Sequence, residues 1–331
     1  MVVIGTSSGG VEVLSRMAGG LPFDLPAAVF VVMHFPENAQ SVLPLILSRA
    51  GPLEAAHPED GDPIEPGRIY VAPPDFHLLL ERGRVRIRRG PRENRHRPAV
   101  DALFRTAAVA YCPRVVGVVL TGARNDGTAG LQAIKQRGGV AIVQDPEDAL
   151  FPGMPESALE YVNVDHCLPL ESIAPLPVRL SREPAEEEGA YPVPDDMELE
   201  SKIAGLDPSA LDSDQRPGTL SHFTCPECSG PLYEIETNDL IRFRCRVGHA
   251  YTAESMLDGK TEELEQALYV ALNTLEENAL MADTLAARSR QQGHGHAAAR
   301  FEERAREARQ QAVVIRRVLT EGSSAAPADA V

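Results

Sequence analysis

Short apolar runs alternate with amphipathic stretches and Gly/Pro turns from Val2 to about Val178. This alternation is typical of βα units arranged around a largely parallel sheet. It predicts an α/β fold with a doubly wound sheet. Buried strands are expected at Val2–Ile4, Ala28–Met33, Val115–Leu120 and Val140–Val143. Helices are expected at Val11–Met17 and at Pro98–Ala110, where proline suits the first turn.

Composition excludes a membrane-spanning protein. The longest dense apolar stretch, Ala27–Met33, is far shorter than the roughly 20 residues that cross a bilayer. Residues 1–5 also lack the basic start of a signal peptide. No membrane insertion is therefore predicted, and the cytoplasm is the expected compartment.

The net charge of −16 disfavours binding to nucleic acid. Much of it lies in residues 183–214, which hold 11 acidic residues and one basic residue, Lys202. A segment this polar buries too little apolar surface to offset its loss of chain entropy. Residues 179–220 are accordingly expected to form an acidic, Pro-rich linker, with one short helix around Asp195–Ile203.

A serine lies where the first strand meets the first helix. The sequence GTSSGG at residues 5–10 matches the G-x-S-x-G pattern of a nucleophile elbow. The unpaired N–H groups at the start of the helix would face a developing negative charge. Ser7 is therefore a candidate nucleophile. A phosphate-binding loop is the alternative, although the G-x-G-x-x-G spacing is not met and no lysine follows.

Two further strand ends carry a histidine and an aspartate. His34 follows the expected strand Ala28–Met33, and Asp126 follows Val115–Leu120. Taken singly, the histidine reads as structural and the aspartate as the N-cap of a helix at Ala129–Lys135. Together with Ser7 they form a plausible triad, with His34 as the base and Asp126 as the group that orients it.

Five motifs extend this pattern through the first half of the chain. They are IGTSSGG (residues 4–10), MHFP (33–36), NRHRPAVD (94–101), TGARNDG (121–127) and GMP (153–155). In this order they resemble the bacterial chemotaxis protein-glutamate methylesterases of the CheB type. The resemblance covers residues 1–178, which are expected to form the catalytic domain.

The resemblance implies hydrolysis of γ-glutamyl methyl esters on chemoreceptor helices, or on a related signalling protein, with deamidation of receptor glutamines as a second activity. It assigns the nucleophile to Ser7, the base to His34 and the acid to Asp126, with no cofactor in catalysis. The oxyanion positions fall on Ser8 and on the backbone of Ala123. A catalytically weak regulatory scaffold is the alternative.

The same resemblance raises two further expectations. Asn94, Arg95 and Arg97 are expected to line the substrate entrance, because guanidinium groups suit an acidic receptor surface. Alternatively, this segment anchors the helix that begins at Pro98. Many members carry an N-terminal receiver domain, whereas this sequence starts at the first catalytic strand, so a separate regulator is expected in its place.

Cysteine spacing predicts a metal site in residues 221–258. Cys225, Cys228, Cys245 and His249 give C-x2-C-x16-C-x3-H, which suits a structural zinc ion in a zinc-ribbon-like module. Four protein ligands would leave no open position for catalysis. The other two cysteines, Cys112 and Cys167, are expected to be buried thiols.

Residues 259–320 show helical periodicity on two stripes. One comprises Leu264, Leu268, Ala271, Leu275 and Ala279, and the other Phe301, Ala305, Ala308, Ala312, Ile315 and Leu319. With a turn at residues 291–296 they predict an antiparallel helical hairpin, whose apolar surface suggests a homodimer contact. Residues 321–331 are expected to be a disordered tail.

Overall fold

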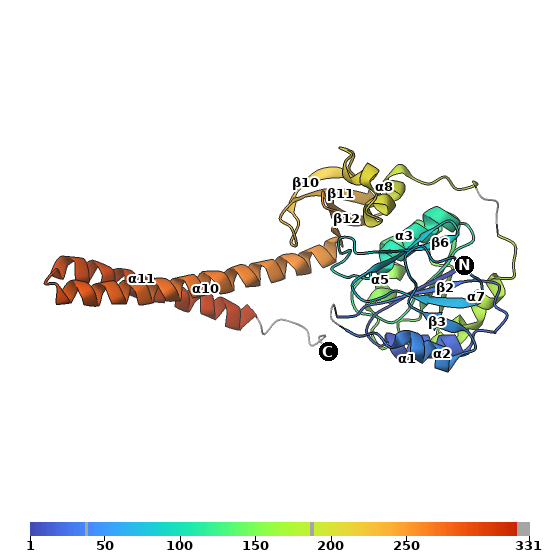
Figure 1. Ribbon diagram of the computed structural model, residues 1–331, viewed down its shortest axis with the longest axis horizontal. Helices are drawn as coiled ribbons and strands as arrows, with labels where there is room; N and C mark the ends of the chain where they lie inside the picture. Colours follow the sequence, from blue (N-terminus) through green and yellow to red (C-terminus); the bar gives the residue numbers. More distant parts are fainter. Residues whose placement is uncertain (37–38, 186–188, 323–331) are drawn as a thin grey trace. The chain divides into compact units, whose positions relative to one another are not determined.

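The computed structural model describes residues 1–36, 39–185 and 189–322. Its largest sheet has the strand order β3-β4-β2-β1-β7-β8-β9, and all neighbours pair in parallel (Figure 1). The strands are β1 (Val2–Thr6), β2 (Val29–Met33), β3 (Glu54–Ala56), β4 (Arg68–Val71), β7 (Val116–Val119), β8 (Val140–Gln144) and β9 (His166–Leu168). Strands β2, β4 and β3 lie on one side of β1, and the later strands β7, β8 and β9 lie on its other side. The predicted α/β fold is confirmed.

Helices cover both faces of this sheet. On one face lie α1 (Gly10–Gly19), α2 (Leu43–Ala50), α6 (Leu170–Ile173) and α7 (Pro175–Leu180), which pack on residues such as Ile4 and Val31. On the other lie α3 (Val100–Tyr111), α4 (Thr128–Gln136) and α5 (Gly153–Tyr161), which pack on Val3 and Phe30 (Figure 1). Because strand side chains alternate between faces, each buried strand supplies both cores.

The strands and helices expected from sequence are present with small shifts at their ends. Apolar patterning did not predict α2, β3, β4, β9, or the antiparallel hairpin of β5 (His77–Glu81) and β6 (Arg84–Arg88). These elements are short, and all but β9 carry charged residues, so their apolar runs are too brief to show a period. Cys167, on β9, is exposed rather than buried.

The acidic segment contains more structure than a linker. Helices α8 (Asp195–Ala204) and α9 (Pro208–Leu211) form within it, and Met197 and Ile203 are buried. Glu200 is also buried and forms ion pairs with Arg242 and Arg244. Acidic composition alone could not reveal this, because the neutralising arginines lie about 40 positions further along the chain. Residues 186–188, in the same segment, lie outside the described residues.

A second sheet carries the predicted cysteine and histidine residues. It is antiparallel, with β10 (Thr219–Thr224), β11 (Pro231–Thr237), β12 (Leu240–Cys245) and β13 (Ala250–Thr252) in that order. We call residues 219–252 the Cys/His module. It belongs to the same compact unit as the large sheet, Met1–Met256.

The remaining compact unit, Leu257–Val331, contains a helical hairpin. Helix α10 (Ala253–Gln291) continues into it and lies beside α11 (Gly295–Gly322) (Figure 1). Their contact is lined by small side chains, namely Ala279, Ala282, Ala286, Ala298, Ala305, Ala308 and Ala312, all buried. Glu321 still belongs to α11, whereas residues 323–331 of the expected tail lie outside the described residues. Leu264 and Val270 are exposed, and the homodimer stays a prediction.

No helix in the described ranges combines the length and the apolar character that crossing a bilayer would need.

Candidate active site

Three neighbouring strands bring Ser7, His34 and Asp126 to one edge of the large sheet. β1 lies between β2 and β7. Ser7 directly follows β1, His34 directly follows β2, and Asp126 lies in the loop between β7 and α4. Because parallel strands end at the same edge, three residues far apart in sequence meet there.

His34 forms hydrogen bonds with both other side chains. Its Nδ1 lies 3.0 Å from Ser7 Oγ, and its Nε2 lies 2.8 Å from Asp126 Oδ2. An ionised carboxylate only accepts hydrogen bonds, so Nε2 carries the ring proton and Nδ1 accepts from the serine hydroxyl. His34 is thus oriented to take the proton of Ser7.

Asp126 is held at the beginning of α3. Its carboxylate accepts hydrogen bonds from the backbone N–H groups of Val100, at 2.7 Å, and Asp101, at 3.2 Å. Both belong to the first turn of α3, where N–H groups are otherwise unpaired and a negative charge is favoured. The N-cap of α4 is Gly127. Asp126 therefore caps α3, whereas the alternative interpretation had expected it to cap the helix that is now α4.

The ionisation of Asp126 is set by its neighbours. Burial would raise its pKa, but the hydrogen bond and charge of His34, together with the Asn94 amide, hold the pKa below its ordinary value. Asn94 Nδ2 donates to Asp126 Oδ1 at 3.0 Å and to Asp101 Oδ2 at 2.7 Å. Asp126 is consequently a carboxylate, able to stabilise a positively charged imidazole ring.

Asp101 is a second buried carboxyl group, which the sequence did not identify as part of the site. Burial and the charge of Asp126 raise its pKa to about 7. Its Oδ1 accepts from the backbone N–H groups of Gly127, at 3.0 Å, and Gly130, at 2.6 Å. It thereby fixes the start of α4 beside the site. Its place in the NRHRPAVD motif was the one available signal.

The loop after β7 lies directly against the serine. A Cβ atom on Gly122 would lie 2.9 Å from Ser7 Cβ and 2.2 Å from Met154 Sδ, so glycine is needed there. Gly122 N–H donates to the Phe151 carbonyl at 2.9 Å, and Met154 N–H donates to the Gly122 carbonyl at 2.8 Å. The GMP motif at the start of α5 therefore holds this loop in place.

The two expected oxyanion positions, Ser8 and Ala123, flank this contact. The N–H of Ser7 itself donates to the Thr121 carbonyl at 3.1 Å. Within the described part of the chain, no hydrogen bond occupies the N–H of Ser8 or of Ala123. Both amides therefore remain available as donors to an oxyanion.

The residues expected at a substrate entrance have other partners. Asn94 is buried and donates a hydrogen bond to Asp126. Arg97 Nε donates to Asp75 Oδ1 at 2.8 Å, and its guanidinium group is mostly buried. Arg95 is half-buried and has a left-handed backbone, with φ of 71°. For Asn94 and Arg97 the structure favours the anchoring alternative, because buried, paired groups do not face a large substrate.

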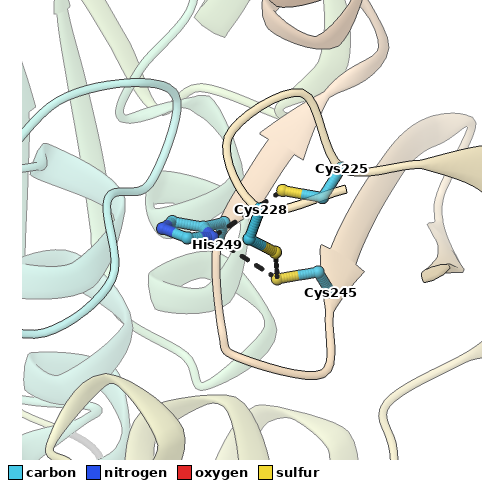
Figure 2. A group of neighbouring side chains, drawn as sticks. All are labelled: Cys225, Cys228, Cys245 and His249. Atoms are coloured by element: carbon cyan, nitrogen blue, oxygen red, sulfur yellow. Dashed lines mark hydrogen bonds between the residues drawn. The ribbon is translucent and has the colours of Figure 1, made fainter. Parts of the chain in front are cut away.

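The four residues of the predicted metal site converge in the Cys/His module (Figure 2). His249 Nδ1 lies 3.7 Å from Cys225 Sγ and 3.5 Å from Cys245 Sγ, and Cys228 Sγ lies 3.6 Å from Cys245 Sγ. With Zn–S distances of about 2.3 Å, ligand atoms around tetrahedral zinc lie about 3.5 to 3.8 Å apart. The donor set and the spacing therefore fit a zinc ion.

A carboxylate lies behind the histidine of this cluster. His249 Nε2 is 3.4 Å from Glu227 Oε2, and Glu227 Oε1 accepts a hydrogen bond from the Tyr251 hydroxyl at 3.0 Å. Metal-bound histidines typically donate their second N–H to such a group, which fixes the ring for ligation. The surroundings of His249 thus also suit a metal ligand.

The sequence and the doubly wound sheet both match those of a class of hydrolase. The chain belongs to the CheB methylesterase family, whose sequence pattern matches residues 2–176. It is 36% identical to the Thermotoga maritima CheB methylesterase catalytic domain, whose crystal structure superposes with a TM-score of 0.52 over 54% of this chain and 97% of that one.

Curated relatives carry matching names. A protein-glutamate methylesterase/protein-glutamine glutaminase of Moorella thermoacetica is 40% identical over 185 residues, which are 54% of this chain and 44% of that protein. A Leptospira interrogans relative, whose name carries the same two activities, is 38% identical over 187 residues, which are 56% of this chain and 97% of that protein.

Proposed function

We propose that this chain hydrolyses methyl esters of glutamate side chains on chemoreceptors, with Ser7 as nucleophile. The observation that carries the proposal is the position of His34, hydrogen-bonded to Ser7 on one side and to Asp126 on the other. Membership of the CheB methylesterase family supports it. Residues 1–178 are the part of the chain to which we assign catalysis.

The reaction proceeds through an acyl-enzyme. Ser7 Oγ attacks the ester carbonyl and passes its proton to Nδ1 of His34, while Asp126 stabilises the imidazolium. The N–H groups of Ser8 and Ala123 bind the oxyanion. The C–O bond then breaks, and methanol leaves with the proton from His34. Water, deprotonated by the same ring, cleaves the acyl-enzyme and restores the serine and a free glutamate.

Glutamine deamidation follows the same steps, with ammonia as the leaving group. His34 protonates the leaving nitrogen just as it protonates the methoxide. One constellation therefore supports both activities that the names of the relatives carry.

Methanol release from methylated chemoreceptors tests the nucleophile. Ser7→Ala should abolish release, because no other group would be activated by His34. Ser15→Ala is the matched control, since the Ser15 hydroxyl, on α1, donates to the Val11 carbonyl and to no other group among the described residues. Release by Ser7→Ala at the rate of the unmodified chain would refute the assignment. A scaffold with a silent triad would release no methanol in any form.

We further propose that Cys225, Cys228, Cys245 and His249 hold a structural zinc ion. The ligand-atom spacing and the carboxylate behind His249 support this. Such an ion would stabilise a sheet too small to fold by its own core. Atomic emission spectroscopy should find one zinc ion per chain, and a zinc-free, fully folded protein would contradict the proposal.

A further inference from the structure

The segment at residues 92–97 pairs with the last strand of the Cys/His module. The N–H of Asn94 donates to the Ala250 carbonyl at 2.7 Å, and the N–H of Ala250 donates to the Arg92 carbonyl at 3.2 Å. A parallel β-bridge joins the two stretches. Ala250 opens β13 immediately after His249, one residue of the proposed zinc site. The active-site segment therefore extends the edge of the module's sheet.

The side chain of Asn94 uses all its hydrogen-bonding positions at this junction. Its Oδ1 accepts from the N–H of Thr252 at 3.0 Å and from the hydroxyl of Ser255 at 3.1 Å. Its Nδ2 donates to the carboxylates of Asp126 and Asp101. An amide offers two donors and two acceptor positions, so none is left over. One buried side chain thus connects the end of the module to the catalytic aspartate.

A buried ionic network fastens the same junction. Arg105, on α3, lies 2.6 Å from Glu93, and Arg244, on β12, lies 3.0 Å from both Glu93 and Glu200. The side chains of these four residues are at most 4% exposed. Removing one partner of a buried ion pair costs about 3 to 5 kcal/mol, because the other charge stays buried and unpaired. The module therefore cannot leave the catalytic domain without a large penalty.

We propose that metal binding in the Cys/His module positions the catalytic acid, with Asn94 as the positioning residue. The zinc ion fixes His249 and the start of β13, β13 fixes Asn94, and Asn94 fixes the carboxylate of Asp126. This inference rests on the proposed function, since it gives Asp126 a catalytic role. Loss of the metal should loosen residues 92–97 and slow turnover while leaving substrate binding nearly intact.

Cys228→Ser in the full chain is the primary test, with Cys167→Ser as its matched control. Both cysteines are exposed, but only Cys228 belongs to the cluster. Three quantities are measured: zinc per chain, hydrogen exchange at residues 92–97, and kcat and KM for methanol release. Cys228→Ser should lose zinc, speed exchange at residues 92–97, and lower kcat by about 10- to 100-fold, the effect of misplacing a catalytic group by about 1 Å. Cys167→Ser should match the unmodified chain.

Asn94→Ala separates positioning from loss of the fold. It keeps every zinc ligand, so zinc content should stay at one ion per chain while kcat falls and KM changes by less than about threefold. Because both changes act on the same contact, the double variant Asn94→Ala/Cys228→Ser should lose less kcat than the product of the two single losses. Multiplicative losses would mean that the metal and Asn94 act independently, and would overturn the proposal.

Other outcomes are equally decisive. Zinc loss in Cys228→Ser with unchanged exchange at residues 92–97 and unchanged kcat would overturn the coupling and leave the proposed esterase intact. If the unmodified chain releases no methanol, the proposed function fails, and hydrogen exchange alone still decides the coupling. If Cys228→Ser also loses protection from hydrogen exchange in β1, this variant has unfolded. The kcat of the zinc-bound Asn94→Ala then decides whether Asn94 positions Asp126. A lower kcat supports this role, and an unchanged kcat refutes it.

Discussion

The imidazole ring of His96 stacks on that of His34, with ring centroids 3.6 Å apart and planes inclined by 6°. Burial and the adjacent His34 lower the pKa of His96 to about 3, so this second ring is neutral at physiological pH. A neutral ring packed face to face limits rotation of His34 away from Ser7. His96 thus braces the base by contact.

Replacing His96 tests this bracing. His96→Ala should lower kcat for methanol release by about tenfold, because a catalytic base that rotates spends less time in its productive geometry. His96→Phe retains a flat ring and should recover most of the loss. Equal losses in both variants would show that the nitrogen atoms of His96, and not its stacked ring, are what the site requires.

Gly122→Ala should also impair the enzyme. The added Cβ would meet Ser7 Cβ at 2.9 Å, so either the serine or the loop must move. We expect kcat to fall by about 10- to 100-fold. Gly205→Ala is the control, because Gly205 has an ordinary helical backbone and its Cβ would have no neighbour closer than 3.4 Å. Methanol release by both variants measures the difference, and equal rates would contradict the predicted contact.

Acid should weaken the unit that contains both sheets. Burial would raise the pKa of Glu200, but Arg242 and Arg244 lower it to about 2, and Arg105 and Arg244 likewise hold the pKa of Glu93 well below its usual range. Between about pH 2 and pH 4.5 the unfolded chain therefore binds more protons than the folded chain. Stability is fully present above about pH 4.5 and is lost as the pH falls toward 2. Urea unfolding at a series of pH values checks this; a flat profile would contradict it.

Glu200→Gln tests the same network at neutral pH. It removes the carboxylate that pairs with Arg242 and one of the two carboxylates that pair with Arg244, and should lower the free energy of unfolding by roughly 3 to 5 kcal/mol. Glu198→Gln, on the same helix, removes only an exposed ion pair with Lys202 and should change little. Urea unfolding of the two variants, compared with the unmodified chain, measures the contrast. Similar effects would mean that burial of the network contributes little.

The helical hairpin should be sensitive to side-chain size at its contact. Ala305 is fully buried between α10 and α11, so Ala305→Leu should destabilise the hairpin by about 1 to 3 kcal/mol through overpacking. Ala299→Leu changes an exposed position of the same helix and should be nearly neutral. Thermal unfolding followed by circular dichroism at the helix wavelength distinguishes them. A neutral Ala305→Leu would show that the helices do not pack at this position.

Much of the site was predictable because it depends on strand ends. A buried strand can be recognised in the sequence as an apolar run, and parallel strands bring the residues that follow them to one edge of the sheet. Ser7, His34 and Asp126 could therefore be grouped from the sequence alone. The candidate metal site could also be recognised from the sequence, because ligand residues at short intervals lie on one turn of the chain.

The supporting contacts were not predictable, because each joins distant positions through tertiary packing. In the sequence, Glu200 is one of many acidic residues in a polar segment. Only the folded structure places Arg242 and Arg244 beside it. From its motif, Asn94 was expected at the substrate entrance, and only the folded structure shows that its backbone pairs with β13. Neither pairing leaves a period or a motif in the sequence.

Covalent labelling tests the central claim most directly. A fluorophosphonate probe reacts with an activated serine and adds a fixed mass to its peptide, which mass spectrometry locates. We predict a single modification on Ser7 that survives in Ser8→Ala, disappears in Ser7→Ala, and is much slower in His34→Ala. A label on any other serine, or labelling of Ser7 that does not depend on His34, would contradict the account.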